Sequence, residues 1–176
     1  MKKKTNFRWV VRIILISVVA SVVFTIASSE LLNRTGSIVA FAILVLFIGI
    51  GIVFDMIGTA VISAQEAPFH SMASHRERGA AEALKLLRNA EKTSSFCNDV
   101  VGDITGIVSG ATAALAASKL MMTLDTQSIL PQLLISAAVV GLTIGGKAMG
   151  KTIALNNNTT IVLKAGKLIN FFHMKK

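Results

Sequence analysis

The stretch SIVAFAILVLFIGIGIVFD, residues 37–55, decides the fold of this chain, because its first eighteen residues carry no charge and the nineteenth is Asp55. A helix needs about 20 apolar residues to cross the hydrocarbon core of a membrane, so this segment is long enough to span one. Backbone N–H and C=O groups in lipid must bond to one another, which predicts a helix over roughly 36–62.

Three other apolar stretches cover roughly residues 9–29, 94–118 and 129–146. Across the chain 53% of the residues are hydrophobic, 15% are charged, and the mean hydropathy is +0.67. This composition lies outside the range of soluble domains. The sequence therefore predicts an all-α membrane protein with about four transmembrane helices in contact with the lipid bilayer. The first stretch also fits a signal peptide, since three lysines precede its apolar core.

The basic residues are distributed unevenly about these helices. The net charge is +9 and the pI is near 10.1. With a cytoplasmic N-terminus, sixteen of the eighteen Lys and Arg residues lie inside, and only Arg34 and Lys119 lie outside. This asymmetry follows the positive-inside rule and predicts a multi-pass protein of a bacterial-type inner membrane with both termini cytoplasmic. Nucleic acid is not expected as a partner, because apolar runs dominate the chain.

The sequence contains none of the common catalytic patterns. Cys97 is the only cysteine, which excludes an intrachain disulfide and a thiolate metal cluster. The three histidines lie apart, and there is no Walker loop or dinucleotide-binding glycine pattern. We therefore do not expect an enzyme.

The connector between the second and third apolar stretches is amphipathic. In HRERGAAEALKLLRNAEK, residues 75–92, alanines and leucines form an apolar stripe at helical spacing. The pattern predicts a juxtamembrane helix within 66–92 on the cytoplasmic interface, and a short solvated helix fits it as well. Residues 160–176 repeat this style, so we expect an amphipathic, interfacial helix at the C-terminus.

Small residues recur at every fourth position of the third apolar stretch. They are Gly102, Gly106, Gly110, Ala114 and Ser118, and Gly146 with Gly150 gives a weaker version in the fourth stretch. Small residues at this spacing let two helix backbones approach closely in lipid. The pattern predicts a packing face within the protomer, in a homodimer, or against another membrane protein.

Acidic residues within the apolar stretches are the candidate site. Placing a carboxylate at the bilayer centre costs about 2.5–3.5 kcal/mol, so such a residue usually faces the protein interior and has a partner. Asp99 and Asp103 lie one helical turn apart, and Asn98, Ser94 and Asp55 add further oxygen ligands. Oxygen ligands without sulfur suit a hard cation such as Mg²⁺.

Two lysines offer these acids a different partner. In GKAMGKTIALNNN, residues 146–158, Lys147 and Lys151 lie one helical turn apart after the uncharged run 129–146. They are either cytoplasmic anchors or partners of the aspartates in an internal salt bridge. The sequence leaves the cation site and the salt bridge equally open.

Four segments, taken in order, share motifs with one known family. FDMIGTAV (54–61) is similar to F-S-x-S-E-T-A-L, NDVVGDI (98–104) to G-N-x-x-x-N-I, and GKAMGKTIA (146–154) to G-E-x-x-P-K-T-x-A. GAAEALKLLRNAE (79–91) is similar to the juxtamembrane segment of the same family. On these motifs the chain resembles, over about 37–172, the transmembrane domain of the CorB/CorC and CNNM (cyclin M) magnesium transporters.

The resemblance implies a three-helix transmembrane domain over 37–159, usually in a homodimer, with a dehydrated Mg²⁺ held between its helices. The helix within residues 1–36 would be an addition, and residues 160–176 would form the tail. We expect the nucleotide-sensing CBS pair and the CorC-type C-terminal domain of the family to be absent.

The departures from the family lie at its ion-binding positions. They are Ile57, Gly58, Lys147 and Gly150, where the family has Ser, Glu, Glu and Pro, and Asp99 and Asp103, where it has Asn. Losing two carboxylates and gaining a lysine weakens a cation site, and two new aspartates partly offset this loss. The sequence therefore predicts a divalent-cation transporter-like protein with an altered site. The alternative is a non-transporting interaction subunit or a degenerate family member, and a holin-like pore is disfavoured.

Overall fold

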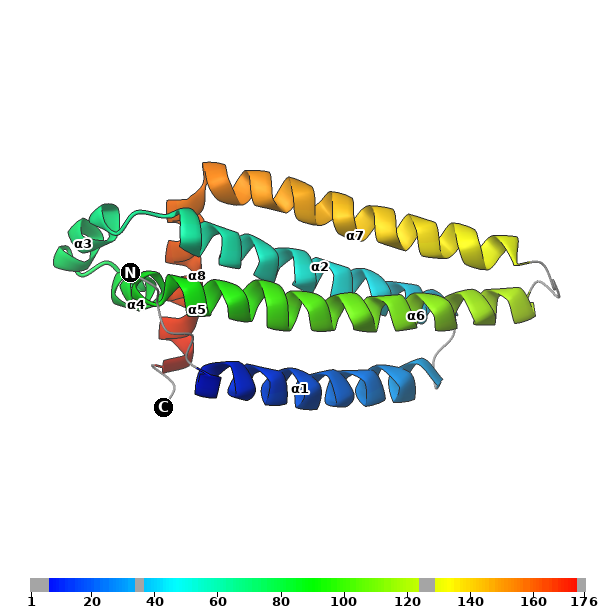
Figure 1. Ribbon diagram of the computed structural model, residues 1–176. Helices are drawn as coiled ribbons and strands as arrows, with labels where there is room; N and C mark the ends of the chain where they lie inside the picture. The colour runs from blue at the N-terminus through cyan, green and yellow to red at the C-terminus, as the bar shows by residue number, and fades with distance from the viewer. Residues whose placement is uncertain (1–6, 34–36, 124–128, 174–176) are drawn as a thin grey trace. The chain divides into compact units, whose positions relative to one another are not determined.

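The computed structural model describes residues 7–33, 37–123 and 129–173, and the regular structure within these ranges is entirely helical (Figure 1). The prediction of an all-α protein is confirmed. The elements are α1 (Phe7–Asn33), α2 (Ser37–Ser63), α3 (Ala67–Ser74), α4 (Ala80–Arg88), α5 (Ala90–Ser95), the π-helical segment η1 (Phe96–Val101), α6 (Gly102–Thr123), α7 (Leu130–Asn156) and α8 (Asn158–His173).

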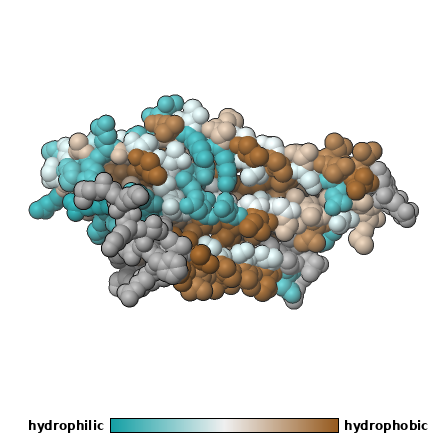
Figure 2. Space-filling model, viewed as in Figure 1, coloured by the Kyte–Doolittle hydropathy of each residue, from teal (hydrophilic) through white to brown (hydrophobic). Residues whose placement is uncertain are grey.

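Three helices of the described chain are long and apolar enough to cross a membrane. They cover Ile38–Ser63, Ala90–Met122 and Leu130–Asn156, which include most of the second, third and fourth apolar stretches. α1 contributes a shorter apolar segment, Ile13–Ile26, whose large side chains are mostly exposed. Brown, hydrophobic side chains follow α1 in Figure 2, whereas hydrophilic ones gather over α3 and α4. Exposed apolar surface on this scale is typical of contact with lipid, and together with the three long apolar helices it indicates a membrane protein.

The described residues form two compact units, and α2, α6 and α7 contribute to both. The first unit comprises residues 1–49 and 103–142. In it Ala40 of α2 and Ala116 of α6 are fully buried in one cluster, joined by Phe41. Two alanines at a helix crossing allow a close approach of the two backbones. Phe24 of α1 meets Phe47 of α2 edge to face, with ring centroids 6.2 Å apart.

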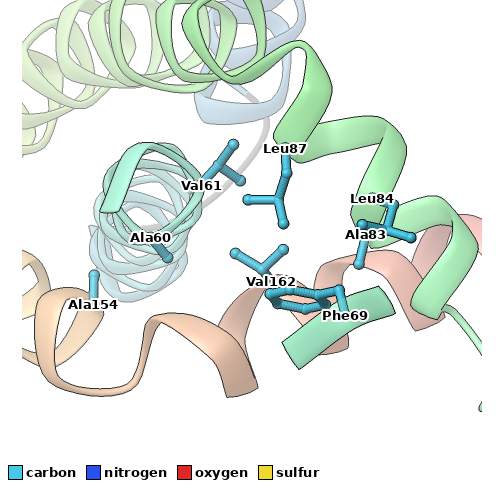
Figure 3. Close-up of a cluster of buried hydrophobic side chains, with 8 residues drawn as sticks. All are labelled: Ala60, Val61, Phe69, Ala83, Leu84, Leu87, Ala154 and Val162. Atoms are coloured by element: carbon cyan, nitrogen blue, oxygen red, sulfur yellow. The ribbon is translucent and has the colours of Figure 1, made fainter. Parts of the chain in front are cut away.

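The second unit, residues 50–102 and 143–176, has a core of small and aliphatic side chains around one aromatic ring. Phe69 of α3 is fully buried there, beside Val162 of α8 in the close-up of Figure 3. The remaining members of the cluster come from α2, α4 and α7. They are Ala60, Val61, Ala83, Leu84, Leu87 and Ala154. This core holds the short helices α3 and α4 against the ends of the long ones.

The sequence predicted one juxtamembrane helix within 66–92. In the structure this connector is divided into several shorter helices. α3 ends at Ser74, and Arg76 and Gly79 then take positive φ values of 55° and 82°. A left-handed residue cannot continue a right-handed helix, so the chain turns here before α4 begins. The apolar stripe of α4 was correctly located, but it is buried against the protein. Ala80, Ala83 and Leu87 are buried, and α4 packs chiefly against α8.

α4 and α8 approach each other at two glycines. A Cβ on Gly166 would lie against the carbonyl oxygen of Gly79 and 2.9 Å from the nitrogen of Ala83. A Cβ on Gly79 would in turn meet the backbone of Gly166 and Lys167. Because these obstacles are backbone atoms, only glycine fits both positions without moving one helix away from the other.

Candidate functional site

Three segments of the second unit contribute polar side chains and glycines to one site. α2 supplies Asp55 and Gly58, the η1–α6 junction supplies Asn98 and Gly102, and α7 supplies Lys147 and Lys151. The members of each pair are three or four residues apart, so each pair lies on one face of its helix.

Glycines on α7 set the distance between α7 and α2. A Cβ on Gly150 would come within 2.9 Å of Cγ of Met56, and one on Gly146 would collide with the end of Ile52. The pair Gly146 and Gly150 therefore receives side chains of α2, as small residues at this spacing allow. This contact brings the lysines of α7 to the level of Asp55.

Asp55 is the acidic residue that the structure buries. Its side chain is 6% exposed, and the ammonium of Lys151 lies 3.7 Å from its Oδ2 atom. Oδ2 accepts no hydrogen bond from the described residues, so this ion pair is its polar contact there. The side chain of Lys151 is 53% exposed, which leaves its ammonium partly in contact with solvent. The salt bridge left open by the sequence is thus present between Asp55 and Lys151.

Lys147 approaches the same place from one turn earlier on α7. Its ammonium donates a hydrogen bond of 3.4 Å to the carbonyl oxygen of Gly102. A Cβ on Gly102 would lie 3.5 Å from this ammonium and 4.0 Å from Oδ1 of Asp55. Gly102 therefore faces both groups, and its lack of a side chain leaves them room. We expected Lys147 beside Asp99 or Asp103, and the structure places its ammonium at a backbone carbonyl.

A π-helical segment shapes the third side of the site. In η1 the N–H of Gly102 donates to the carbonyl oxygen of Cys97, five residues earlier, which widens the turn. Single π-helical turns inside α-helices are frequent at functional sites. Asn98 lies in this turn and donates a hydrogen bond of 3.2 Å from Nδ2 to Oγ of Ser94, which is buried.

Asn98 occupies the space beside Gly58. A Cβ on Gly58 would overlap Oδ1 of Asn98 and lie 2.8 Å from its Cγ atom. Oδ1 itself is buried and accepts no hydrogen bond from the described residues. A buried carbonyl oxygen without a partner is costly, so this atom is the place where a donor or a cation would stabilise the site most.

The other predicted ligands do not join this group. Asp99 and Asp103 are exposed, although they lie beside buried positions of η1 and α6. Among the described residues, no three His, Cys, Asp or Glu side chains are grouped as metal ligands. The predicted oxygen ligands that remain in this part of the second unit are therefore Asp55, Asn98 and Ser94. Ile57 is half-buried and packs against the core of the second unit.

The small-residue face of α6 is buried at its start and open further on. Gly102 is buried, Gly106 is half-buried, and Gly110 and Ala114 are exposed. A Cβ on Gly106 or Gly110 would meet no atom within 4 Å. The other buried residues of α6 are Ile104, Thr105, Val108, Ser109, Thr112, Ala113, Ala116 and Ala117.

The charges of the site decide its chemistry. One buried carboxylate faces two ammonium groups, and the ammonium groups are held at a carboxylate oxygen and at a carbonyl oxygen. These are the oxygen types that bind Mg²⁺ in proteins. With two positive charges already present, a divalent cation would meet repulsion before any coordination could offset it. The arrangement therefore gives the buried Asp55 carboxylate a lysine partner within a candidate membrane span.

Sequence reasoning missed two contacts of this site. Gly58 was treated as an altered ion-site position and Asn98 as a metal ligand, with no contact expected between them, and Gly102 was assigned only to the small-residue face. The π-helical turn that brings Asn98 and Gly102 into the site was not predicted, because the residues FCNDVV form no sequence pattern that distinguishes a π-helix from an α-helix. One signal of this contact was available in the sequence. It is Gly58, a residue without a side chain near the end of a long apolar segment.

Comparison of the chain with family models, with curated proteins and with solved structures gives no match. The resemblance to the magnesium transporters therefore rests on the four motifs alone.

Proposed function

We propose that this chain is a multi-pass membrane protein with the CorB/CorC and CNNM transmembrane architecture, in which lysine ammonium groups take the place of the transported cation. On this proposal the protein does not carry Mg²⁺ itself. It acts as a membrane subunit that associates with itself or with another membrane protein. The observation that carries the proposal is the position of Lys147 and Lys151, at the Gly102 carbonyl and at Asp55.

The position of Lys147 in the motifs supports this assignment. It corresponds to the second glutamate of the family, and Lys151 corresponds to a lysine that the family also has. A protein-borne ammonium supplies one positive charge at a fixed place, and it needs no ion from solution. An unpaired carboxylate in low dielectric is costly, so Asp55 is stabilised by these neighbours when no metal is bound.

The contact between Gly58 and Asn98 supports the alignment of the motifs. Position 58 corresponds to a glutamate in the family, and position 98 corresponds to a glycine. Here the small residue is at 58 and the larger one at 98, and the two positions touch. A reciprocal exchange of size at two touching positions keeps the volume between the helices constant.

The second candidate function is divalent-cation transport through an altered site. It is favoured by the buried Oδ2 of Asp55 and Oδ1 of Asn98, which accept no hydrogen bond from the described residues. A hard cation would satisfy both oxygens. Lys151 is half-exposed and could turn toward solvent, whereas Lys147 would have to leave the Gly102 carbonyl.

We further propose that α1 is a fourth membrane span and that both termini are cytoplasmic. The sixteen-to-two distribution of basic residues supports this topology. The test is a Cys97→Ser chain carrying Lys85→Cys on the exposed face of α4, treated with a membrane-impermeant thiol reagent. Labelling only after the cells are opened is expected. Labelling in intact cells would overturn the topology.

Ion flux distinguishes the two functions. The purified protein is reconstituted into liposomes that contain a Mg²⁺-sensitive dye, and external Mg²⁺ is added. We expect the wild-type influx to equal that of protein-free liposomes. Flux above this background that is abolished by Asp55→Asn would overturn the proposal in favour of transport.

A further inference from the structure

α8 lies where two candidate membrane spans end. α7 ends at Asn156, and α8 begins two residues later and leaves α7 in a different direction (Figure 1). The amide of Asn158 donates a hydrogen bond of 3.1 Å to the carbonyl oxygen of Ser63, the last residue of α2. The start of α8 is thus tied to the end of a second span. A helix at this level lies at the depth of the lipid headgroups.

α8 has a buried face and an exposed face. Val162, Ala165 and Gly166 are buried against the rest of the second unit. Away from this contact, Phe171 and Phe172 are 63% and 67% exposed, and their rings meet edge to face with centroids 6.0 Å apart. Lys164 and Lys167 are exposed on the same helix. Large apolar side chains beside lysines are typical of a helix at a membrane surface.

A hollow opens between α8 and the turn before α4. It has a volume of about 650 Å³, and its lining residues are Glu77, Arg78, Lys167, Asn170 and Phe171. Lys167 also forms a salt bridge of 3.1 Å with Glu77, which fixes its ammonium at the rim. The two basic groups outnumber the single acid. The accessible surface of the hollow is almost entirely apolar, so these residues line it mainly with their carbon atoms, and their charged and amide groups belong to the same side chains.

The turn that carries Arg78 has a fixed backbone. Arg76 and Gly79 on either side of Glu77 and Arg78 have φ values of 55° and 82°. Gly79 lies against the backbone of Gly166 and Lys167 of α8. The close glycine contact therefore places the guanidinium-bearing residue next to Lys167, and the two basic residues come from segments about ninety residues apart in the sequence.

We infer that this hollow, with the exposed phenylalanines of α8, binds an anionic membrane lipid, whose phosphate headgroup lies at the charged ends of the lining residues and whose apolar part contacts the apolar wall. Arg78 and Lys167 attract the phosphate, and the amide of Asn170 donates a hydrogen bond to it. Phe171 and Phe172 contact the glycerol and the upper acyl chains. Charge complementarity and the position at the end of two spans select a lipid of the surrounding leaflet over a soluble anion. The inference does not depend on whether the protein transports a cation.

The experiment measures lipid binding to the full chain in a neutral detergent. Native mass spectrometry counts the phosphatidylglycerol and the phosphatidylcholine that stay bound to the wild type, and a melting curve records the stabilisation by each. We expect retention of phosphatidylglycerol and a higher melting temperature with it, because a ligand bound by the folded state stabilises that state. Phosphatidylcholine and soluble glycerol phosphate are expected to give neither effect.

The matched variants remove the same charges inside and outside the hollow. R78Q/K167Q should lower the affinity for phosphatidylglycerol about thirtyfold, since each basic residue near a membrane surface contributes about fivefold. R88Q/K164Q changes exposed Arg and Lys residues of α4 and α8 outside the hollow and should leave the affinity within about threefold. F171S keeps the charges and should lose retention of the lipid.

Three results would overturn the inference. One is equal retention of phosphatidylglycerol and phosphatidylcholine by the wild type. Another is equal loss of affinity in both double variants, which would show attraction to the net charge of the protein alone. The third is an equal rise in melting temperature with glycerol phosphate, which would show a site for soluble phosphate. Gel filtration of R78Q/K167Q checks that the variant is folded, and K167Q alone repeats the comparison if it is not.

Discussion

The ammonium of Lys151 lies 3.7 Å from Oδ2 of Asp55, and the two side chains differ sharply in exposure, at 53% and 6%. The pair joins two candidate membrane spans at residues 96 positions apart in the sequence. The lysine can turn toward water, but the aspartate cannot. The free energy of the pair therefore depends mainly on what happens to the carboxylate.

This difference predicts unequal effects of removing the two partners. Lys151→Gln leaves a buried carboxylate without its ion pair and should lower the stability by about 1–3 kcal/mol, less than for a fully buried pair because Lys151 is half-exposed. Asp55→Asn leaves a lysine that can be solvated and should cost less than about 1 kcal/mol. Melting curves of both variants and of the double variant measure the coupling, and the double variant should be more stable than Lys151→Gln alone. A larger cost for Asp55→Asn would contradict this description.

The contact between Gly58 and Asn98 gives the second prediction. Gly58→Ala places a Cβ against the Asn98 amide, which must turn and give up its 3.2 Å hydrogen bond to Ser94. We expect a loss of about 1–2 kcal/mol. Adding Asn98→Ala to Gly58→Ala should recover part of it, because the obstructing amide is gone. Gly49→Ala is the control, since no atom lies within 4 Å of the added Cβ. Failure of the second substitution to recover stability would show that the two positions do not touch.

The helix crossing at Gly166 gives the third prediction. In Gly166→Ala the new Cβ meets backbone atoms of Gly79 and Ala83, which cannot rotate away as a side chain does. We expect a loss of about 2–3 kcal/mol, because α4 and α8 must separate. Gly145→Ala on α7 adds the same methyl group in open space and should be neutral or slightly stabilising. Equal melting temperatures for the two variants would contradict the close approach.

The exposed small residues of α6 give the fourth prediction. Gly110→Leu has open space within the protomer, so the fold should tolerate it. If this face forms the interface between two copies, the variant should dissociate in detergent while Ala111→Leu, at an exposed neighbouring position, does not. Size-exclusion chromatography with light scattering measures the mass. Wild-type association of Gly110→Leu would show that the face contacts lipid.

The membrane helices were predictable because each one is encoded by a continuous apolar run. The uncharged run before Asp55 lies within α2, and all but the first residue of the run 129–146 lies within α7. The ends were less accurate: α7 continues to Asn156, so Lys147 and Lys151 lie inside the helix and not after it. A lysine interrupts an apolar pattern but does not end a helix, because lysine has a high helix propensity.

The candidate site was predictable in part. A buried aspartate with a lysine partner could be expected from the cost of charge in a membrane. The choice among three aspartates could not be made, because exposure depends on which face of α6 meets its neighbours. The break of the connector at Gly79 also depends on a distant residue, Gly166, which fixes the backbone there.

The most direct test of the lysine-for-cation proposal is the effect of Mg²⁺ on the melting temperature of the wild type and of Lys147→Glu. The substitution places a carboxylate at the Gly102 carbonyl, near Asp55, so the metal-free variant should be less stable than the wild type. Low millimolar Mg²⁺ should raise the melting temperature of the variant and leave that of the wild type unchanged, because only the variant offers a net negative site. Lys164→Glu, which makes the same charge change on the exposed side of α8, should not respond. A wild type that is stabilised by Mg²⁺ as much as the variant is would contradict the proposal that lysine replaces the cation.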